Sequence, residues 1–244
     1  MDFINSGQKI EVAVGTEANP RVLRWTTWRG RRNDLRVSYL LVTDDGGIVI
    51  DPLKLPREGL DHLRGFVDGF AAVVLTCANH DRDARWFGNQ VKAPVLAPEG
   101  SPARAHKSVK RTYGDEQLLG GVRAVASGKR DGEMGLFWPQ GRRRLLFCGD
   151  TIYGQTESDG LAGYPPKWWM QTDGIRLYMS GQQSKSQMRE RYSVVVDMAP
   201  TEVFNGHNPR PISDASTAIA EVLKTGKLEV IKGAGTYLWR RWPE

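Results

Sequence analysis

The chain has 244 residues, 40% of them hydrophobic, so it is long enough to bury a sizeable core. Its 34 Lys and Arg and 28 Asp and Glu residues leave a formal net charge of +6. No nucleic-acid-binding motif accompanies the basic residues, so we expect no nucleic-acid partner. The two cysteines lie far apart, which argues against a disulfide framework. No run approaches the roughly 20 apolar residues of a membrane span, and no signal peptide is visible, so we expect a cytoplasmic protein.

The first half of the chain predicts strands followed by a helix. Residues 21–28 alternate as a strand does, and residues 38–42 and 48–51 flank an Asp/Gly turn, which predicts a hairpin. Apolar residues then recur at helical spacing between Leu60 and Val67. The unbroken apolar run 71–75 predicts a buried strand.

A chemically dense stretch follows that strand. It reads Thr-Cys-Ala-Asn-His-Asp-Arg-Asp-Ala over residues 76–84 and leads into a predicted helix at 82–90. Open α/β sheets bind ligands at the carboxyl ends of their strands. A thiol, an imidazole and two carboxylates at such a position are typical of a metal site or an acid–base site.

The second half of the chain predicts a second sheet and two more helices. Residues 101–110 favour a short helix, and residues 117–126, 132–138 and 144–148 favour strands. Helices are predicted at 184–196 and 214–224, on either side of a strand at 202–204 that ends before His207.

Residues 152–174 form a long insert rich in Gly, Pro, Tyr and Trp, including Tyr164, Trp168 and Trp169. Inserts of this length are usually functional, for example as a lid or a binding loop. Exposed aromatic residues also mark contacts between copies of a chain. The insert therefore predicts a substrate pocket, and a homodimer contact is the alternative.

The order of these features resembles the metallo-β-lactamase superfamily over residues 36–225. The resemblance rests on the hairpin ending in Ile-Asp-Pro, the Leu-Thr after the buried strand, Gly132-Glu133, Phe-Cys-Gly-Asp-Thr at 147–151 and Gly206-His207. It implies one α/β domain over residues 1–244, a four-layer αβ/βα sandwich with a binuclear metal site at one edge. It also implies a hydrolase of ester, lactone or related acyl bonds.

The leading metal motif of the family, Thr-His-x-His-x-Asp-His, is degenerate in this chain. Without a gap its ligand positions hold Cys77, Asn79, Asp81 and Arg82. Lys129 stands where the Gly-His-x-x-Gly-Glu stretch of the family has its histidine. The bridging aspartate and the last histidine match Asp150 and His207.

The resemblance and the available donors predict at most one metal ion. His80, Asp81, Asp150 and His207 are its candidate ligands, with Cys77 as a weaker one; zinc would suit nitrogen and sulfur ligands, and calcium, magnesium or manganese an oxygen-rich set.

A site without metal is the alternative. Arg82 and Lys129 would then supply the positive charge that polarises a substrate carbonyl group. In both cases Asp81, Asp83 or Asp150 would activate water, and His207 would act as ligand or proton carrier.

Other interpretations of these residues stay open. His80 and Asp81 also fit the start of the following helix, where Asp is a common cap. Cys77 fits a small buried side chain, and a Cys77–His80 nucleophilic pair has no third orienting group in the sequence. At the level of the whole chain, the alternative to an esterase or lactonase acting on a small molecule is a metal-free ligand-binding protein.

Overall fold

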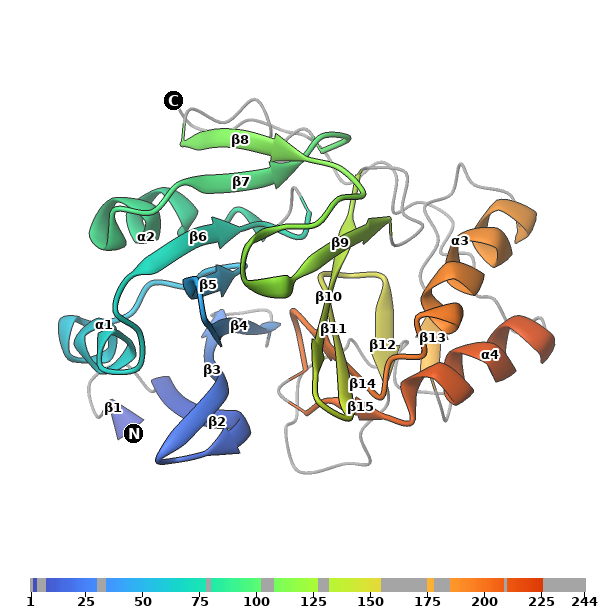
Figure 1. Ribbon diagram of the computed structural model, residues 1–244, viewed down its shortest axis with the longest axis horizontal. Coiled ribbons are helices and arrows are strands. Elements are labelled where there is room, and N and C mark those ends of the chain that lie inside the picture. Colours follow the sequence, from blue (N-terminus) through green and yellow to red (C-terminus); the bar gives the residue numbers. More distant parts are fainter. Residues whose placement is uncertain are drawn as a thin grey trace.

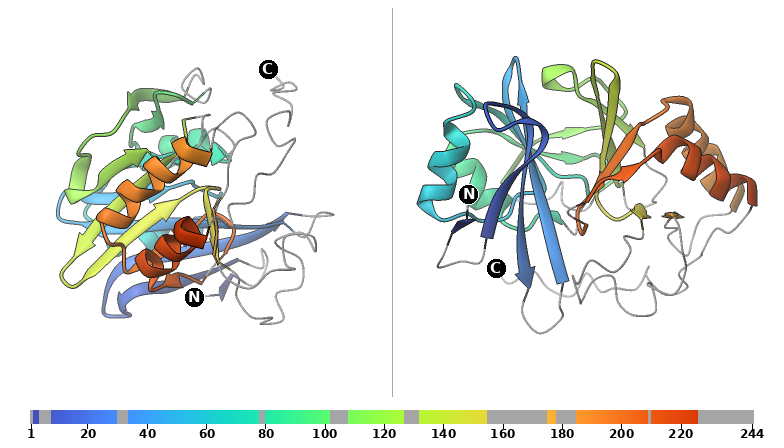
Figure 2. Two further views of the ribbon diagram at one scale, coloured as in Figure 1. Left: turned by 90° about the vertical axis from the view of Figure 1, so that its right-hand side faces the viewer. Right: turned by 90° about the horizontal axis from the view of Figure 1, so that it is seen from below.

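Two β-sheets face each other in this computed structural model, and each carries two helices on its outer surface (Figure 1; Figure 2, right). The structure describes residues 2–3, 8–29, 34–77, 80–101, 108–126, 132–154, 175–177, 185–208 and 210–225. The layers follow the order helix, sheet, sheet, helix. The predicted αβ/βα sandwich is therefore confirmed.

The first sheet contains eight strands in sequence order. Its strands are β1 (Asp2–Phe3), β2 (Gln8–Thr16), β3 (Asn19–Arg29), β4 (Asp34–Thr43), β5 (Gly46–Ile50), β6 (Phe70–Val74), β7 (Val95–Pro98) and β8 (Val109–Tyr113). Neighbours are antiparallel from β1 to β5 and parallel from β5 to β8. The connections from β5 to β6 and from β6 to β7 run through α1 (Arg57–Arg64) and α2 (Ala84–Val91), which cover the outer face.

The second sheet has the strand order β15-β14-β11-β10-β9. Its strands are β9 (Arg123–Ala126), β10 (Met134–Gln140), β11 (Arg143–Cys148), β14 (Glu202–Asn205) and β15 (Ile212–Ser213). The helices α3 (Lys185–Asp197) and α4 (Ala215–Thr225) cover its outer face, and β12 (Ile152–Gly154) pairs with β13 (Ile175–Leu177). No helix in the described ranges is both long and apolar enough to cross a bilayer.

Three apolar clusters join the four layers. The central cluster lies between the sheets and includes Tyr39, Trp138, Phe147 and Phe204, all almost completely buried. A second cluster packs the first sheet against α1 and α2, and a third packs the second sheet against α3 and α4. Because a strand sends alternate side chains to opposite faces, the inner strands of both sheets contribute to a cluster on each side.

Two predicted elements are wrong in detail. The strand expected at 117–126 is only Arg123–Ala126, because Gly120 and Gly121 have φ angles of 61° and 74° in a short 3₁₀ turn that interrupts it. The helix expected at 101–110 does not continue to its end, since Val109–Tyr113 is the edge strand β8. The helices predicted at 184–196 and 214–224 are confirmed within two residues by Lys185–Asp197 and Ala215–Thr225.

The hydroxyl group of Tyr39 connects the two sheets through the buried core. It donates a hydrogen bond of 2.7 Å to the Asn205 carbonyl oxygen at the end of β14. We expect Tyr39→Phe to lower the free energy of unfolding by about 1–2 kcal/mol, because a buried acceptor loses its donor while the packing stays. Urea denaturation measures this change. Tyr113→Phe is the matched control. It removes the hydrogen bond that another buried tyrosine makes within the first sheet, and so leaves the junction between the sheets intact.

Candidate metal-binding site

Four strand ends meet at one edge of the sandwich and carry the polar side chains of the candidate site. Asp51 follows β5, His80 lies in the turn after β6, Asp150 follows β11, and His207 follows β14. The strands β5 and β6 are parallel, as are β11 and β14. Parallel strands end at the same edge of a sheet, so the register brings the residues of each sheet together in a pair. The packing of the two sheets then brings the two pairs to one place.

Asp51 is the buried anchor on the first sheet. Its side chain accepts hydrogen bonds from the Thr76 backbone nitrogen (2.8 Å) and hydroxyl group (2.6 Å). The same carboxylate lies 2.7 Å from Nδ1 of His80. Because Asp51 is only 2% exposed, these three contacts supply the hydrogen bonds that water would otherwise provide. They fix the imidazole ring of His80 so that its Nε2 atom faces the second sheet.

Three ligand atoms converge opposite Asp51. His80 Nε2 lies 3.2 Å from His207 Nε2 and 3.2 Å from Asp150 Oδ1. His207 Nε2 lies 3.0 Å from the same oxygen. The three atoms therefore form a nearly equilateral triangle whose corners come from both sheets.

The protons on the two rings determine what this triangle can hold. His207 Nδ1 lies 3.1 Å from the Leu35 carbonyl oxygen, which can only accept, and His80 Nδ1 donates to Asp51. Both Nε2 atoms of the neutral rings therefore direct lone pairs toward each other and toward a carboxylate oxygen. Only a cation removes this repulsion, either a proton on Nε2 or a metal ion.

A single metal ion fits this donor set. Ligand atoms about 2.0 Å from a tetrahedral zinc ion lie roughly 3.3 Å apart, close to the spacing seen here. Each imidazole also binds an oxygen acceptor through its other nitrogen, the usual arrangement around metal-ligating histidines. His80, Asp150 and His207 are thus the residues that would hold the ion.

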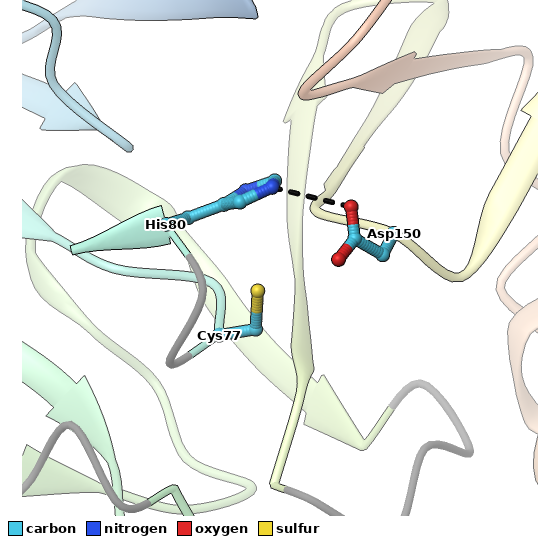
Figure 3. Close-up of side chains that lie close together, drawn as sticks. All are labelled: Cys77, His80 and Asp150. Atoms are coloured by element: carbon cyan, nitrogen blue, oxygen red, sulfur yellow. Dashed lines mark ion pairs between the residues drawn. The ribbon is translucent and has the colours of Figure 1, made fainter. Parts of the chain in front are cut away.

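Cys77 lies beside this triangle. Its sulfur and the ligand atoms of His80 and Asp150 are all within 4.8 Å of one another. Figure 3 shows the Cys77 side chain directed toward the space between the other two. A thiolate at this position would add a soft ligand and favour zinc or iron over calcium or magnesium.

The surrounding charges alter the pKa values of two groups. Burial and the Arg82 charge act to lower the pKa of His80, but Cys77, Asp150 and Asp51 together raise it well above its ordinary value. In the metal-free protein His80 is therefore the group that holds the proton. Burial raises the pKa of the Cys77 thiol, although the nearby His80 opposes the shift.

Two glycines make room for the His80 ring. A Cβ atom on Gly206 would lie 2.4 Å from Cε1 of His80, and one on Gly149 would lie 3.2 Å from its Nδ1. A side chain at Gly206 would displace the ring, and one at Gly149 would clash first with the Thr76 hydroxyl oxygen, 2.6 Å from its Cβ position. In the Gly-Asp and Gly-His pairs of the sequence, the second residue is thus a candidate ligand, and the glycine leaves space for the His80 ring.

The carboxylate of Glu133 fixes the backbone around Asp150 through hydrogen bonds. One of its carboxylate oxygens accepts the backbone N–H groups of Gly149 (3.1 Å), Asp150 (2.8 Å) and Thr151 (3.0 Å), and also the Thr151 hydroxyl (2.8 Å). The sequence analysis used Glu133 only as a landmark before a hairpin and did not predict this role. Asp51 was missed in the same way, although Ile-Asp-Pro at a strand end was a visible signal.

The structure separates the other predicted residues from the triangle. Asp83, the first residue before α2, accepts a hydrogen bond of 2.8 Å from the Lys54 backbone nitrogen. Arg82 donates to three backbone carbonyl oxygens. Asp81 is half-buried and is not part of the Cys77–His80–Asp150 group. His80 does not cap the helix but faces Asp150 and His207.

The remaining predicted residues cannot be compared with the structure. Lys129, Tyr164, Trp168 and Trp169 lie outside the described residues.

The raised pKa of His80 predicts how the metal-free protein responds to pH. The folded state keeps a proton that the unfolded state releases above pH 6.5, so this stabilisation is complete below that pH. We expect the free energy of unfolding to fall as pH rises from 6.5 to about 8.5, before the cysteines titrate. Urea denaturation with a metal chelator measures the slope. His80→Gln should flatten it, whereas His62→Gln should not, because burial lowers the pKa of His62.

The contacts of Glu133 predict a large effect from a small change. We expect Glu133→Gln to lower the free energy of unfolding by about 2 kcal/mol, because four donors lose a charged acceptor in a buried position. Chemical denaturation measures the loss. Glu116→Gln, which removes an exposed pair with Arg111, should change stability by less than about 0.5 kcal/mol. Equal effects of the two variants would contradict the role of Glu133.

Known proteins share this architecture. Residues 16–158 match the family model described as the metallo-β-lactamase superfamily. No curated protein matches the chain. The structure of a metallo-β-lactamase from Pontibacter korlensis is similar, with 14% identity, a TM-score of 0.59 and coverage of 91% of this chain and 100% of that one.

Two further solved structures resemble the chain and were determined with metal. The metallo-β-lactamase FIM-1 from Pseudomonas aeruginosa, in a mono-zinc form, is 13% identical, with a TM-score of 0.57 and coverage of 90% and 97% of the two chains. A structure solved in a di-iron-bound form is 18% identical, with a TM-score of 0.52 and coverage of 79% and 96%. At these identities the structures show the shared fold alone. With the family match over more than half of its length, the chain belongs to the metallo-β-lactamase superfamily, whose members are generally metal-dependent hydrolases.

Proposed function

We propose that this protein hydrolyses an ester, lactone or related acyl bond at a site that holds one metal ion. The observation that carries the proposal is the triangle of His80 Nε2, His207 Nε2 and Asp150 Oδ1, with sides of 3.0–3.2 Å. Both imidazoles are oriented by oxygen acceptors, and both Nε2 atoms point inward. Such preorganisation of ligands is what a catalytic metal site requires.

Zinc or iron suits these residues better than calcium or magnesium. Two imidazole nitrogens and a nearby thiol are ligands that transition metals prefer, whereas Asp150 supplies the oxygen. When bound, such an ion polarises a carbonyl group and lowers the pKa of a water molecule. One ion rather than two follows from the motif, because Cys77 and Asn79 replace two of its histidines.

The side chains around the triangle would place the substrate on the side of the second sheet. His80 is 3% exposed, whereas Asp150 and His207 are 15% and 11% exposed. A substrate therefore approaches Asp150 and His207, and His80 closes the bottom of the site. Asp150 is positioned to accept a proton from attacking water, because its carboxylate lies on the more exposed side of the triangle.

The second candidate function is ligand binding without metal. The observation that favours it is the raised pKa of His80, because a proton on that ring can replace the cation between Asp51 and Asp150. Arg82 adds a second permanent charge a short distance away. In this case the site would need no ion and would bind a ligand without hydrolysing it.

Metal analysis combined with an activity panel decides between the two functions. We expect purified protein to contain close to one equivalent of zinc or iron and to hydrolyse at least one substrate in a panel of aryl esters and lactones. Asp150→Ala and His207→Ala should each lower kcat/KM at least about 100-fold and release the metal, because each removes a ligand.

The control variant is Asp61→Asn, which alters a 52% exposed carboxylate on α1. It should keep both the metal content and the activity of the unmodified protein. A chain that binds no metal and hydrolyses nothing, or activity that survives both ligand substitutions, would contradict the proposed hydrolase.

A further inference from the structure

We infer that Arg82 is a positioning residue that holds the Gly206–His207 turn in place and so determines where the His207 imidazole lies. The inference rests on the proposed role of His207 as a metal ligand. It concerns a residue that the motif comparison treated as a lost histidine, and it gives that residue a different task from polarising a substrate.

The Arg82 guanidinium donates to three backbone carbonyl oxygens, one within β4, one after β5 and one after β14. Its Nη1 atom donates to the Val37 carbonyl oxygen at 2.6 Å and to the Asp51 carbonyl oxygen at 3.1 Å. Its Nη2 atom donates to the Gly206 carbonyl oxygen at 2.9 Å. Val37 and Asp51 belong to the first sheet and Gly206 to the second. A planar guanidinium can bridge all three in a fixed geometry, which a lysine ammonium cannot.

The burial and the backbone conformation of Arg82 are both unfavourable, which indicates a specific structural role. Burial lowers the pKa of the guanidinium, although Asp51 opposes the shift. Its guanidinium donates to three neutral carbonyl oxygens, so these hydrogen bonds bring no opposite charge to compensate for its burial. Its backbone also has a φ of 34°, a strained value for a residue with a side chain. A partly buried cation on a strained backbone is costly, and its contacts with three carbonyl groups offset that cost.

The Gly206–His207 turn is the segment on which these contacts act. Gly206 accepts the Val37 backbone N–H at 2.8 Å through the same carbonyl group that binds Arg82. His207 binds the Leu35 carbonyl oxygen through Nδ1. The turn is thus attached to β4 by two hydrogen bonds, one at the Gly206 carbonyl group and one at the His207 ring. The hydrogen bond from Arg82 to Gly206 is charge-assisted.

Close packing links the position of the Gly206–His207 turn to the triangle. A Cβ atom on Gly206 would lie 3.1 Å from Nη2 of Arg82 and 2.4 Å from Cε1 of His80. The guanidinium, the glycine and the imidazole are therefore in contact without spare room. Arg82 sets the position of Gly206 against His80, and with it the 3.2 Å separation of the two Nε2 atoms.

Hydrogen exchange and zinc binding test the inference together. In metal-free Arg82→Met we expect the Val37 amide, which bonds to Gly206, to exchange faster, while the Val73 amide, which bonds to Pro94 within the first sheet, keeps its rate. Zinc affinity, measured by competition with a chromophoric chelator, should fall about 10- to 100-fold. Arg82→Lys should show the same pattern, because the single ammonium nitrogen cannot occupy the positions of both Nη1 and Nη2.

Arg64→Met is the matched control, since Arg64 also donates to a backbone carbonyl oxygen, that of Gln90, on the surface away from the site. It should change neither Val37 exchange nor zinc affinity. Unchanged zinc affinity and Val37 exchange in both Arg82 variants would overturn the inference. Equal acceleration of Val37 and Val73 would also overturn it, because that pattern indicates a general loss of stability.

The proposed function can fail separately. If the unmodified protein binds no metal, the hydrolase is excluded, and the ratio of the Val37 and Val73 exchange rates still decides whether Arg82 positions the turn. If Arg82→Met does not fold, Arg82→Lys provides both measurements.

Discussion

The carboxylate of Asp51 is the group on which the whole site depends. A carboxylate that is 2% exposed must satisfy its oxygens within the protein, and Thr76 and His80 do so with three contacts of 2.6–2.8 Å. These contacts shape the turn after β6 and fix which nitrogen of His80 faces outward. A degenerate metal motif can therefore still present a ligand, although the ligand stands at another position of the motif.

The second sheet also relies on a buried carboxylate. There Glu133 binds three consecutive backbone N–H groups and so fixes the loop that carries Asp150. From the first sheet the partly buried cation Arg82 binds the carbonyl oxygens of Val37 and Gly206. Asp150 and the turn that carries His207 are thus held through the backbone, whereas His80 is held through its ring by Asp51. The geometry is therefore rigid even though the two sheets meet only at their edges there.

Sequence reasoning predicted the fold and included all three residues of the triangle among the candidate ligands. Turn residues and apolar runs marked the hairpin of β4 and β5, and the resemblance to the family pointed to Asp150 and His207. The direction of the His80 side chain could not be predicted, because it depends on a partner 29 residues away. That contact exists only because Ile50 pairs with Val74 in the parallel register. The hydrogen bonds of Glu133 could not be predicted from the sequence either, since they depend on the pairing of β10 with β11.

The lack of space around the His80 ring limits what engineering could recover from this site. Replacing Cys77 with the histidine of the family motif would introduce an imidazole where the sulfur already lies 3.2 Å from any Cβ on Gly149. A Cβ atom on Gly149 would also lie 3.2 Å from Nδ1 of His80 and 2.6 Å from the Thr76 hydroxyl oxygen. Adding a histidine beside Gly149 therefore requires the His80 ring or the Thr76 side chain to move.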